Sequence, residues 1–213
     1  MDEYSNKFYK KQLETVQKNL VANGFKNTVI FEDTNSMVDY VTSLIGTGKK
    51  IGIGGSQSVR LSGLLENLKS KGNEIITHTH DMNVQTRRNV WLAAQQADFY
   101  LASPQAVTFD GELIFLDAYG NRVSAIIFGP SKVLLICGRN KLVKDIETGI
   151  WRSRNIAAVK NNIRLGRENP CVKTGKCENC NSQQRICNIL VVLHKKPAFT
   201  EYEIMLVNQE LGY

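Results

Sequence analysis

Long apolar runs are missing from this sequence of 213 residues: none approaches the roughly 20 residues that a membrane-spanning helix requires. The first four residues, Met-Asp-Glu-Tyr, carry charge and lack the apolar region of a secretion signal. Aromatic residues make up 8% of the chain, and they are not interleaved with basic residues as in proteins that bind single-stranded nucleic acid. We therefore expect a cytoplasmic protein without a membrane partner, and find little support for nucleic acid as a partner.

Internal repeats and low-complexity linkers are also missing, which predicts a single α/β domain over residues 1–213. Hydrophobic residues make up 42% of the chain, enough for a sizeable core. The formal net charge is +7, which suits an anionic ligand and, less specifically, nucleic acid. Surface lysines that serve only solubility explain this charge equally well.

The spacing of apolar residues predicts alternating helices and strands in the first half of the chain. Helices are expected around residues 9–20, 34–45, 59–68 and 83–96, and strands around 28–31, 51–53, 74–77 and 98–102. This alternation favours a parallel sheet covered by helices on both faces. Strands joined by tight turns follow, with Asp110-Gly111 as a hairpin signal. The remaining expected strands are 106–109, 112–117, 123–127, 132–137, 189–193 and 204–207, and the remaining helices are 143–155 and 161–167.

A turn rich in glycine and serine joins the second of these strands to the next helix, with the sequence IGIGGSQS (51–58). Its glycine spacing matches neither the dinucleotide-binding fingerprint nor the P-loop. Glycines allow the backbone to approach a ligand closely, and the free N–H groups at a helix start attract anions. The turn therefore predicts an anion site, although a strand-to-helix turn capped by serine explains the same residues.

Several stretches together resemble the LUD-domain family of the lactate-utilization protein C type. They are GIGGS (52–56), ASPQAVTFDG (102–111), YGNR (119–122), FGP (128–130), CGRNK (137–141) and the cysteine segment after residue 168. The resemblance implies a Rossmann-like three-layer sandwich similar to the sugar-phosphate isomerase and coenzyme A transferase group, in which the glycine-rich turn receives an anionic group. Members of this type are implicated in oxidising lactate alongside iron–sulfur partner proteins. The resemblance thus implies a link to organic-acid utilization, and a homo-oligomer is a further expectation.

Polar residues follow three of the apolar strands, and parallel sheets bind ligands at the carboxyl ends of their strands. We expect these residues to converge on one small anionic ligand: an organic acid, a sugar phosphate or an acyl-coenzyme A. Asp110 is the candidate general acid or base, although turn chemistry beside a glycine explains both Asp110 and Asn121 equally well. The expected ligand-binding residues are Gly54, Gly55, Ser56, Ser58, Gln105, Thr108, Asn121, Arg139, Asn140 and Lys141.

Four of the five cysteines lie within residues 168–188, a polar segment expected to be an insertion into the domain: Cys171, Cys177, Cys180 and Cys187. In a chain without a secretion signal, this spacing predicts a metal site. Zinc, an iron–sulfur cluster, and reduced or disulfide-linked cysteines remain as alternatives, and the spacing matches neither standard ferredoxin run. A metal centre would also fit a non-catalytic assembly or electron-transfer subunit, the alternative to an enzyme. His78 and His80 are weaker candidates for metal binding or proton transfer.

Overall fold

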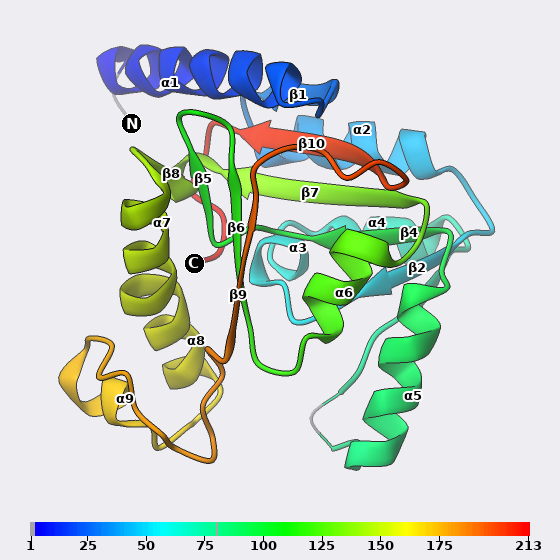
Figure 1. Cartoon of the computed structure of the whole chain (residues 1–213). Coiled ribbons are helices and arrows are strands. Elements are labelled where there is room, and N and C mark those ends of the chain that lie inside the picture. The colour runs from blue at the N-terminus through cyan, green and yellow to red at the C-terminus, as the bar shows by residue number, and fades with distance from the viewer. Residues whose placement is uncertain (1–2, 80) are drawn as a thin grey trace.

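The computed structural model describes residues 3–79 and 81–213, and in this part of the chain a six-stranded sheet has the order β1-β10-β7-β4-β2-β3 (Figure 1). All neighbouring strands run parallel. Their apolar runs pair in this way because a parallel sheet is buried on both faces. The strands are β1 (Asn27–Phe31), β2 (Lys50–Ile53), β3 (Glu74–Ile76), β4 (Phe99–Ala102), β7 (Lys132–Gly138) and β10 (Glu201–Val207).

The central strand β7 shows how the sheet divides the core into two halves. Val133 and Leu135 belong to one hydrophobic cluster, whereas Leu134 and Ile136 belong to the other, because successive side chains of a strand point to opposite faces. The helices that cover the first face are α1 (Glu3–Ala22), α5 (Val84–Gln95) and α6 (Asn121–Phe128); those on the second are α2 (Thr34–Ile45), α3 (Gln57–Arg60) and α4 (Leu64–Ser70). The expected Rossmann-like three-layer α/β fold is therefore confirmed.

A smaller sheet with the order β8-β5-β6-β9 adjoins the central one. Its strands are β5 (Ala106–Thr108), β6 (Leu113–Asp117), β8 (Leu142–Val143) and β9 (Ile189–Leu193). Strands β5 and β6 form the expected antiparallel hairpin, in which Ala106 pairs with Ile114. At its turn Gly111 has a φ of +84°, and a Cβ there would lie 2.8 Å from the backbone of Asn19. Only glycine fits both the backbone conformation and the close approach to α1.

The prediction of a strand over residues 123–127 is wrong, because these residues belong to helix α6. Val123 and Ile126 are buried three residues apart, on one helix face. The Asp117 carboxylate accepts hydrogen bonds from the backbone N–H groups of Arg122 and Val123 at 3.1 and 3.0 Å. This local capping satisfies the first turn of the helix and outweighs the strand propensity of the β-branched run.

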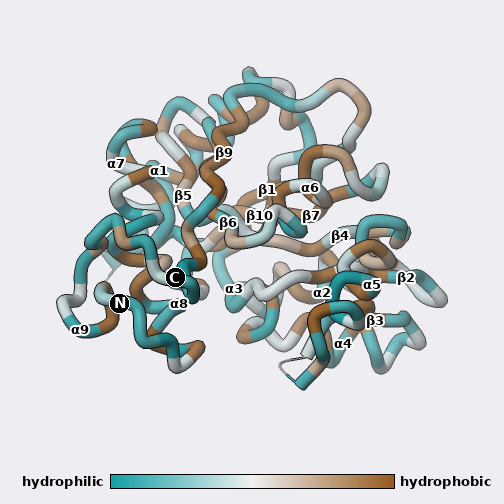
Figure 2. The backbone as a smooth tube through the Cα atoms, turned by 60° about the horizontal axis from the view of Figure 1, so that its bottom comes forward, coloured by the Kyte–Doolittle hydropathy of each residue, from teal (hydrophilic) through white to brown (hydrophobic). Residues whose placement is uncertain are grey.

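The chain after β8 forms one continuous helical segment, where two separate helices were expected. Helix α7 (Ile146–Arg152) continues through a π-helical turn (Ser153–Ala157) into α8 (Ala158–Arg164). The cysteine segment follows and contains the short helix α9 (Pro170–Thr174). Figure 2 shows α8 and α9 on one side of the molecule, with α4 and α5 on the other. Within the described ranges, no helix has both the length and the apolar character needed to cross a membrane.

Candidate functional site

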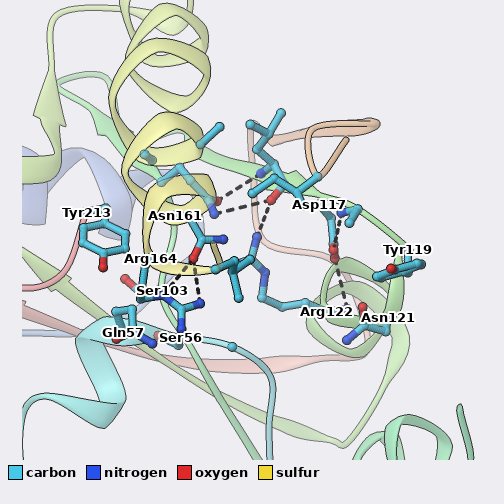
Figure 3. Close-up of a pocket in the computed structure, with 18 of the residues that line it drawn as sticks. Ser56, Gln57, Ser103, Asp117, Tyr119, Asn121, Arg122, Asn161, Arg164 and Tyr213 are labelled. Atoms are coloured by element: carbon cyan, nitrogen blue, oxygen red, sulfur yellow. Dashed lines mark hydrogen bonds between the residues drawn. The ribbon is translucent and has the colours of Figure 1, made fainter. Parts of the chain in front are cut away.

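A cavity of 560 Å³ lies where the central sheet, the smaller sheet and α8 meet. Its lining comes from the residues directly after β2 and β4, from the end of β6 and the start of α6, and from one face of α8. Figure 3 shows Asn161 and Arg164 on the α8 side, and Asp117, Asn121 and Arg122 on the opposite side. The three strand ends that the sequence pointed to, those of β2, β4 and β7, thus meet at a single cavity, because parallel strands end at the same edge of a sheet.

The lining of this cavity is strongly basic. It includes Arg60, Arg122, Arg164 and Arg167, and in the described part of the chain none of these forms an ion pair with a carboxylate. The Asp117 carboxylate in the lining already accepts three backbone N–H groups, those of Ala118, Arg122 and Val123. The cavity therefore has the charge of a site for an anion.

Lys141 is the most deeply buried charged group in the cavity wall, with 3% of its surface exposed. Its Nζ atom lies 2.7 Å from Ser58 Oγ and 2.6 Å from Ser103 Oγ. A carboxylate partner is missing among the described residues. Burial, aided by the charges of Arg152 and Arg122, lowers the pKa of Lys141 to about 7, because a desolvated ammonium group is disfavoured.

The two loops that carry Ser103 and Lys141 are held together by the buried side chain of Arg152 on α7. Its Nη1 atom donates to the backbone carbonyl of Gln105 at 2.5 Å, and its Nε atom donates to that of Asn140 at 3.0 Å. One guanidinium group thus bridges the end of β4 and the turn after β7. This bridge sets the short distance between Ser103 and Lys141.

We expect the stability of the protein to rise with pH above neutrality because of Lys141. In the unfolded chain the amine titrates near 10.5, whereas in the folded protein its pKa is about 7. Between these values the unfolded state binds one more proton, so the free energy of unfolding should increase by about 1.4 kcal/mol per pH unit from this group. Urea unfolding across this range measures the slope. Lys141→Met should remove the contribution and exposed Lys71→Met should keep it, and an equal slope in both variants contradicts the assignment.

The structure brings six of the ten predicted ligand-binding residues to the cavity: Gly55, Ser56, Ser58, Gln105, Asn121 and Lys141. Ser56 caps the start of α3, since its Oγ accepts the N–H of Val59, and the same residue lines the cavity. The Gln105 side chain is bonded to the backbone of Leu116 at the end of β6. The Gln105 side chain therefore forms part of the cavity wall, and its amide group is already hydrogen-bonded within the protein.

The other predicted residues lie outside the lining. Asp110 is exposed on the β5–β6 turn, where its backbone carbonyl accepts from Asn23, and Thr108 bonds to Glu112. Gly54 lies behind the cavity, next to the Tyr100 hydroxyl. Asn140 accepts the N–H of Leu211, and Arg139 donates to the carbonyl of Asn208 and lies 4.6 Å from the Tyr9 ring centroid. The geometry therefore gives Asp110 no place beside the other candidates.

Several cavity residues were not predicted from the sequence as ligand-binding. Arg60 could have been found from the sequence, because it follows the Ser56 cap by four residues and so lies on the same face of α3. Arg122 belongs to the motif YGNR (119–122) but was not predicted to bind a ligand, and its Nε atom is buried without a hydrogen-bond partner in the described part of the chain. Nothing in the sequence predicted Arg164 as a cavity residue, because only the packing of α8 places it near the glycine–serine turn.

Aromatic side chains form part of the cavity rim. The Trp91 and Tyr119 rings lie 5.2 Å apart between centroids, and Tyr119 is 66% exposed. The Trp91 indole N–H donates to His78 Nδ1 at 3.1 Å. This contact gives His78 a role in holding the Trp91 ring at the rim. The other candidate histidine, His80, lies outside the described residues.

The four clustered cysteines line a second, much smaller cavity next to α8 together with Arg154 and Arg185. Asn162 of α8 donates to Cys171 Sγ at 3.5 Å, and Cys177 N–H donates to Asn155 of the π-helical turn, so these two elements anchor the segment. Burial raises the pKa of Cys171, and the charges of the three other thiols raise it further. Across the described residues no three His, Cys, Asp or Glu side chains are arranged as metal ligands. The sulfur atoms share a cavity, but they would have to turn toward one another to bind a metal.

Comparison with known proteins places this architecture in a family. The sequence model of the LUD domain matches residues 13–207. The chain therefore belongs to the LUD domain family, which confirms the resemblance of its motifs. Curated proteins gave no match to the sequence.

The solved structures that are similar to the chain include a family protein and a more distant one. One is a DUF162 family protein from Deinococcus radiodurans, with a TM-score of 0.54 and 11% identity over 93% of this chain and 98% of that one. The other is eIF2B beta from Chaetomium thermophilum, with a TM-score of 0.36 and 12% identity over 54% of this chain and 44% of that one. At this identity the first likeness supports the fold alone, and the second is too distant to carry an argument.

Proposed function

We propose that the basic cavity binds a small anionic ligand: an organic acid, a sugar phosphate or an acyl-coenzyme A. The observation that carries this proposal is the pair of buried Nε atoms of Arg122 and Arg167, which have no hydrogen-bond partner in the described part of the chain. A buried charged donor left unpaired costs free energy. A carboxylate or phosphate would satisfy these donors, because its oxygens match the planar guanidinium group.

The size of the cavity and the family support this class of ligand. A cavity of 560 Å³ lies within the range of about 300–1,000 Å³ typical of small-molecule sites. The likeness to lactate-utilization proteins makes a 2-hydroxy acid the first ligand to test. The rings of Trp91 and Tyr119 at the rim favour a ligand that also carries a flat or apolar group, as an acyl-coenzyme A does.

Arg122→Gln should weaken the binding of such a ligand by about tenfold or more, because it removes a charge-assisted hydrogen bond. Calorimetry with lactate, ribose 5-phosphate and acetyl-coenzyme A measures the affinities. Arg88→Gln removes the same charge from an exposed position outside the cavity lining and should leave them unchanged. Failure of the parent protein to bind any of the three, or equal losses in both variants, contradicts the proposal.

A second candidate function rests on the shared cavity of the four cysteines. We propose that Cys171, Cys177, Cys180 and Cys187 hold one metal centre, either zinc or an iron–sulfur cluster. Four thiolates suit both, and Arg154 and Arg185 in the same lining offset their charge. Zinc would order the loop, whereas a cluster would supply electron transfer, with iron–sulfur proteins as partners. The loop would then serve assembly or electron transfer, independently of the basic cavity.

A further inference from the structure

Three side chains from separate segments form a hydrogen-bonded chain in the wall of the basic cavity. Ser103 follows β4, Lys141 ends the turn after β7, and Ser58 lies in α3. Lys141 Nζ lies 2.6 Å from Ser103 Oγ and 2.7 Å from Ser58 Oγ, and all three residues are buried and line the cavity. The expected role of Lys141, a cation that pairs with the ligand, does not account for this arrangement.

The partners of Ser58 determine which way the protons point. The Ser58 hydroxyl donates to the backbone carbonyl of Leu211 at 3.1 Å, so it accepts from Lys141. A neutral Lys141 amine then donates to Ser58 and keeps its lone pair for the hydroxyl proton of Ser103. The alternative acceptor for Ser103, the carbonyl of Pro104, is farther away at 3.3 Å. The geometry is that of a nucleophile, a base and a group that orients the base.

We infer that Ser103 is a nucleophile activated by Lys141, and that the cavity transfers the acyl group of an anionic ester or thioester to Ser103 and then to water. Ser58 is a positioning residue, because it acts on the substrate only through Lys141. The inference rests on the proposed function, since the guanidinium groups of the lining hold the anionic part of the substrate. A pair of serine and lysine is a known alternative to the triad of serine, histidine and aspartate.

The proposed reaction has two balanced halves. Ser103 Oγ forms a bond to the carbonyl carbon, and its proton passes to Lys141 Nζ. The bond from that carbon to sulfur or oxygen then breaks, and the Lys141 ammonium group returns the proton to the leaving thiolate or alkoxide. A water molecule next attacks the acyl-Ser103 carbonyl and gives its proton to Lys141, which returns it to Ser103 Oγ as the carboxylic acid leaves. The net reaction consumes one water molecule and yields an acid and a thiol or alcohol.

The base works only when Lys141 is neutral, which makes the reaction dependent on pH. Burial among arginines lowers the pKa of Lys141 to about 7, so the amine becomes a competent base as the pH rises through neutrality. The groups that face it are the Ser58 and Ser103 hydroxyls, the guanidinium groups of Arg122 and Arg152, and the Cys137 thiol, whose pKa burial raises to about 11, above this range. The rate of attack by Ser103 should therefore rise with pH and level off above about 8.

A neutral electrophile tests the nucleophile without requiring anion binding. Phenylmethanesulfonyl fluoride should form one covalent adduct with the full chain, and peptide mass spectrometry should place it on Ser103. Ser103→Ala should abolish the adduct, and Lys141→Met should slow its formation by about 100-fold or more. Ser58→Ala should slow it less and shift the midpoint of the pH profile. Exposed Ser70→Ala should leave both unchanged.

The possible outcomes separate this inference from the proposed function. No adduct on Ser103 in the folded parent protein, the same rate in Lys141→Met, or a rate that does not change between pH 6 and 9 would overturn the inference. The pH profile of the parent protein decides the matter even if Lys141→Met fails to fold. Arg122→Gln should weaken anion binding and still form the adduct on Ser103, with the midpoint of its pH profile at higher pH, because one of the charges that lower the pKa of Lys141 is gone. An adduct on Ser103 without binding of any anion would instead overturn the proposed function and the substrate class stated here.

Discussion

Gly52→Ala should lower the melting temperature by about 6–12 °C, which corresponds to a loss of about 3 kcal/mol in a domain of this size. A Cβ on Gly52 would lie 2.3 Å from the backbone carbonyl oxygen of Ala94 and 2.9 Å from the buried ring of Tyr100. Neither neighbour can move cheaply, because Ala94 belongs to the backbone of α5 and Tyr100 to the adjacent strand β4. The added methyl group would force α5 away from the sheet.

The matched control for this variant is Gly55→Ala in the same motif. A Cβ on Gly55 has no heavy atom within 4 Å in the described part of the chain, and the residue is exposed. Its melting temperature should therefore change by no more than about 2 °C. Thermal unfolding of both variants by circular dichroism measures the difference. If Gly52→Ala melts at the parent temperature, the packing of α5 against β2 is looser than the structure shows.

Removal of metal from the four cysteines should make residues 168–188 sensitive to protease while the rest of the domain stays folded. This segment is polar and has only the short helix α9, so it has little apolar surface to hold it in place. Binding of the metal and ordering of the loop are then coupled, so the free energy of metal binding also stabilises the ordered loop. The central sheet has its own buried core, which does not depend on the loop. Chelation or Cys177→Ser should therefore speed tryptic cleavage at Lys173, Lys176 and Arg185 at an almost unchanged melting temperature.

Metal content and amide exchange provide the controls for this prediction. Cys137 is a buried thiol of β7, outside the cluster, so Cys137→Ala should leave the metal content unchanged, whereas Cys177→Ser should lower it. A stoichiometric disulfide among the four cysteines in reduced protein would contradict the metal assignment. So would amide exchange across Cys171 to Cys187 in metal-free protein that is as slow as in Val133 to Ile136.

Local patterns predicted most of the elements of this fold, because periodicity and turn residues act over short distances. The alternation before residue 102 gave the parallel sheet, and Asp110-Gly111 gave the hairpin. The error over residues 123–127 also has a local cause, since the strand propensity of the run was weighed without its cap, Asp117. A carboxylate four residues before a helix start is only weak evidence for a helix cap until the conformation of the turn between them is known.

Most of the predicted residues that line the cavity follow the ends of strands in the central sheet. Ser56, Ser58 and Lys141 line the cavity, because the segments that carry them follow strands of one parallel sheet. Arg139 shows the limit of this argument. It lies two residues from Lys141, yet the tight turn after β7 directs it toward Tyr9 of α1, while Lys141 enters the cavity.

The sequence by itself determined the α/β alternation, the glycine–serine turn and the grouping of four cysteines, because each depends on residues close together in the chain. Only the tertiary structure decided which basic residues gather. Arg60, Arg122 and Arg164 come from α3, α6 and α8, and the packing of these helices decides that they line one cavity. The lowered pKa of Lys141 has the same origin, because desolvation exists only where the folded chain excludes water from the amine.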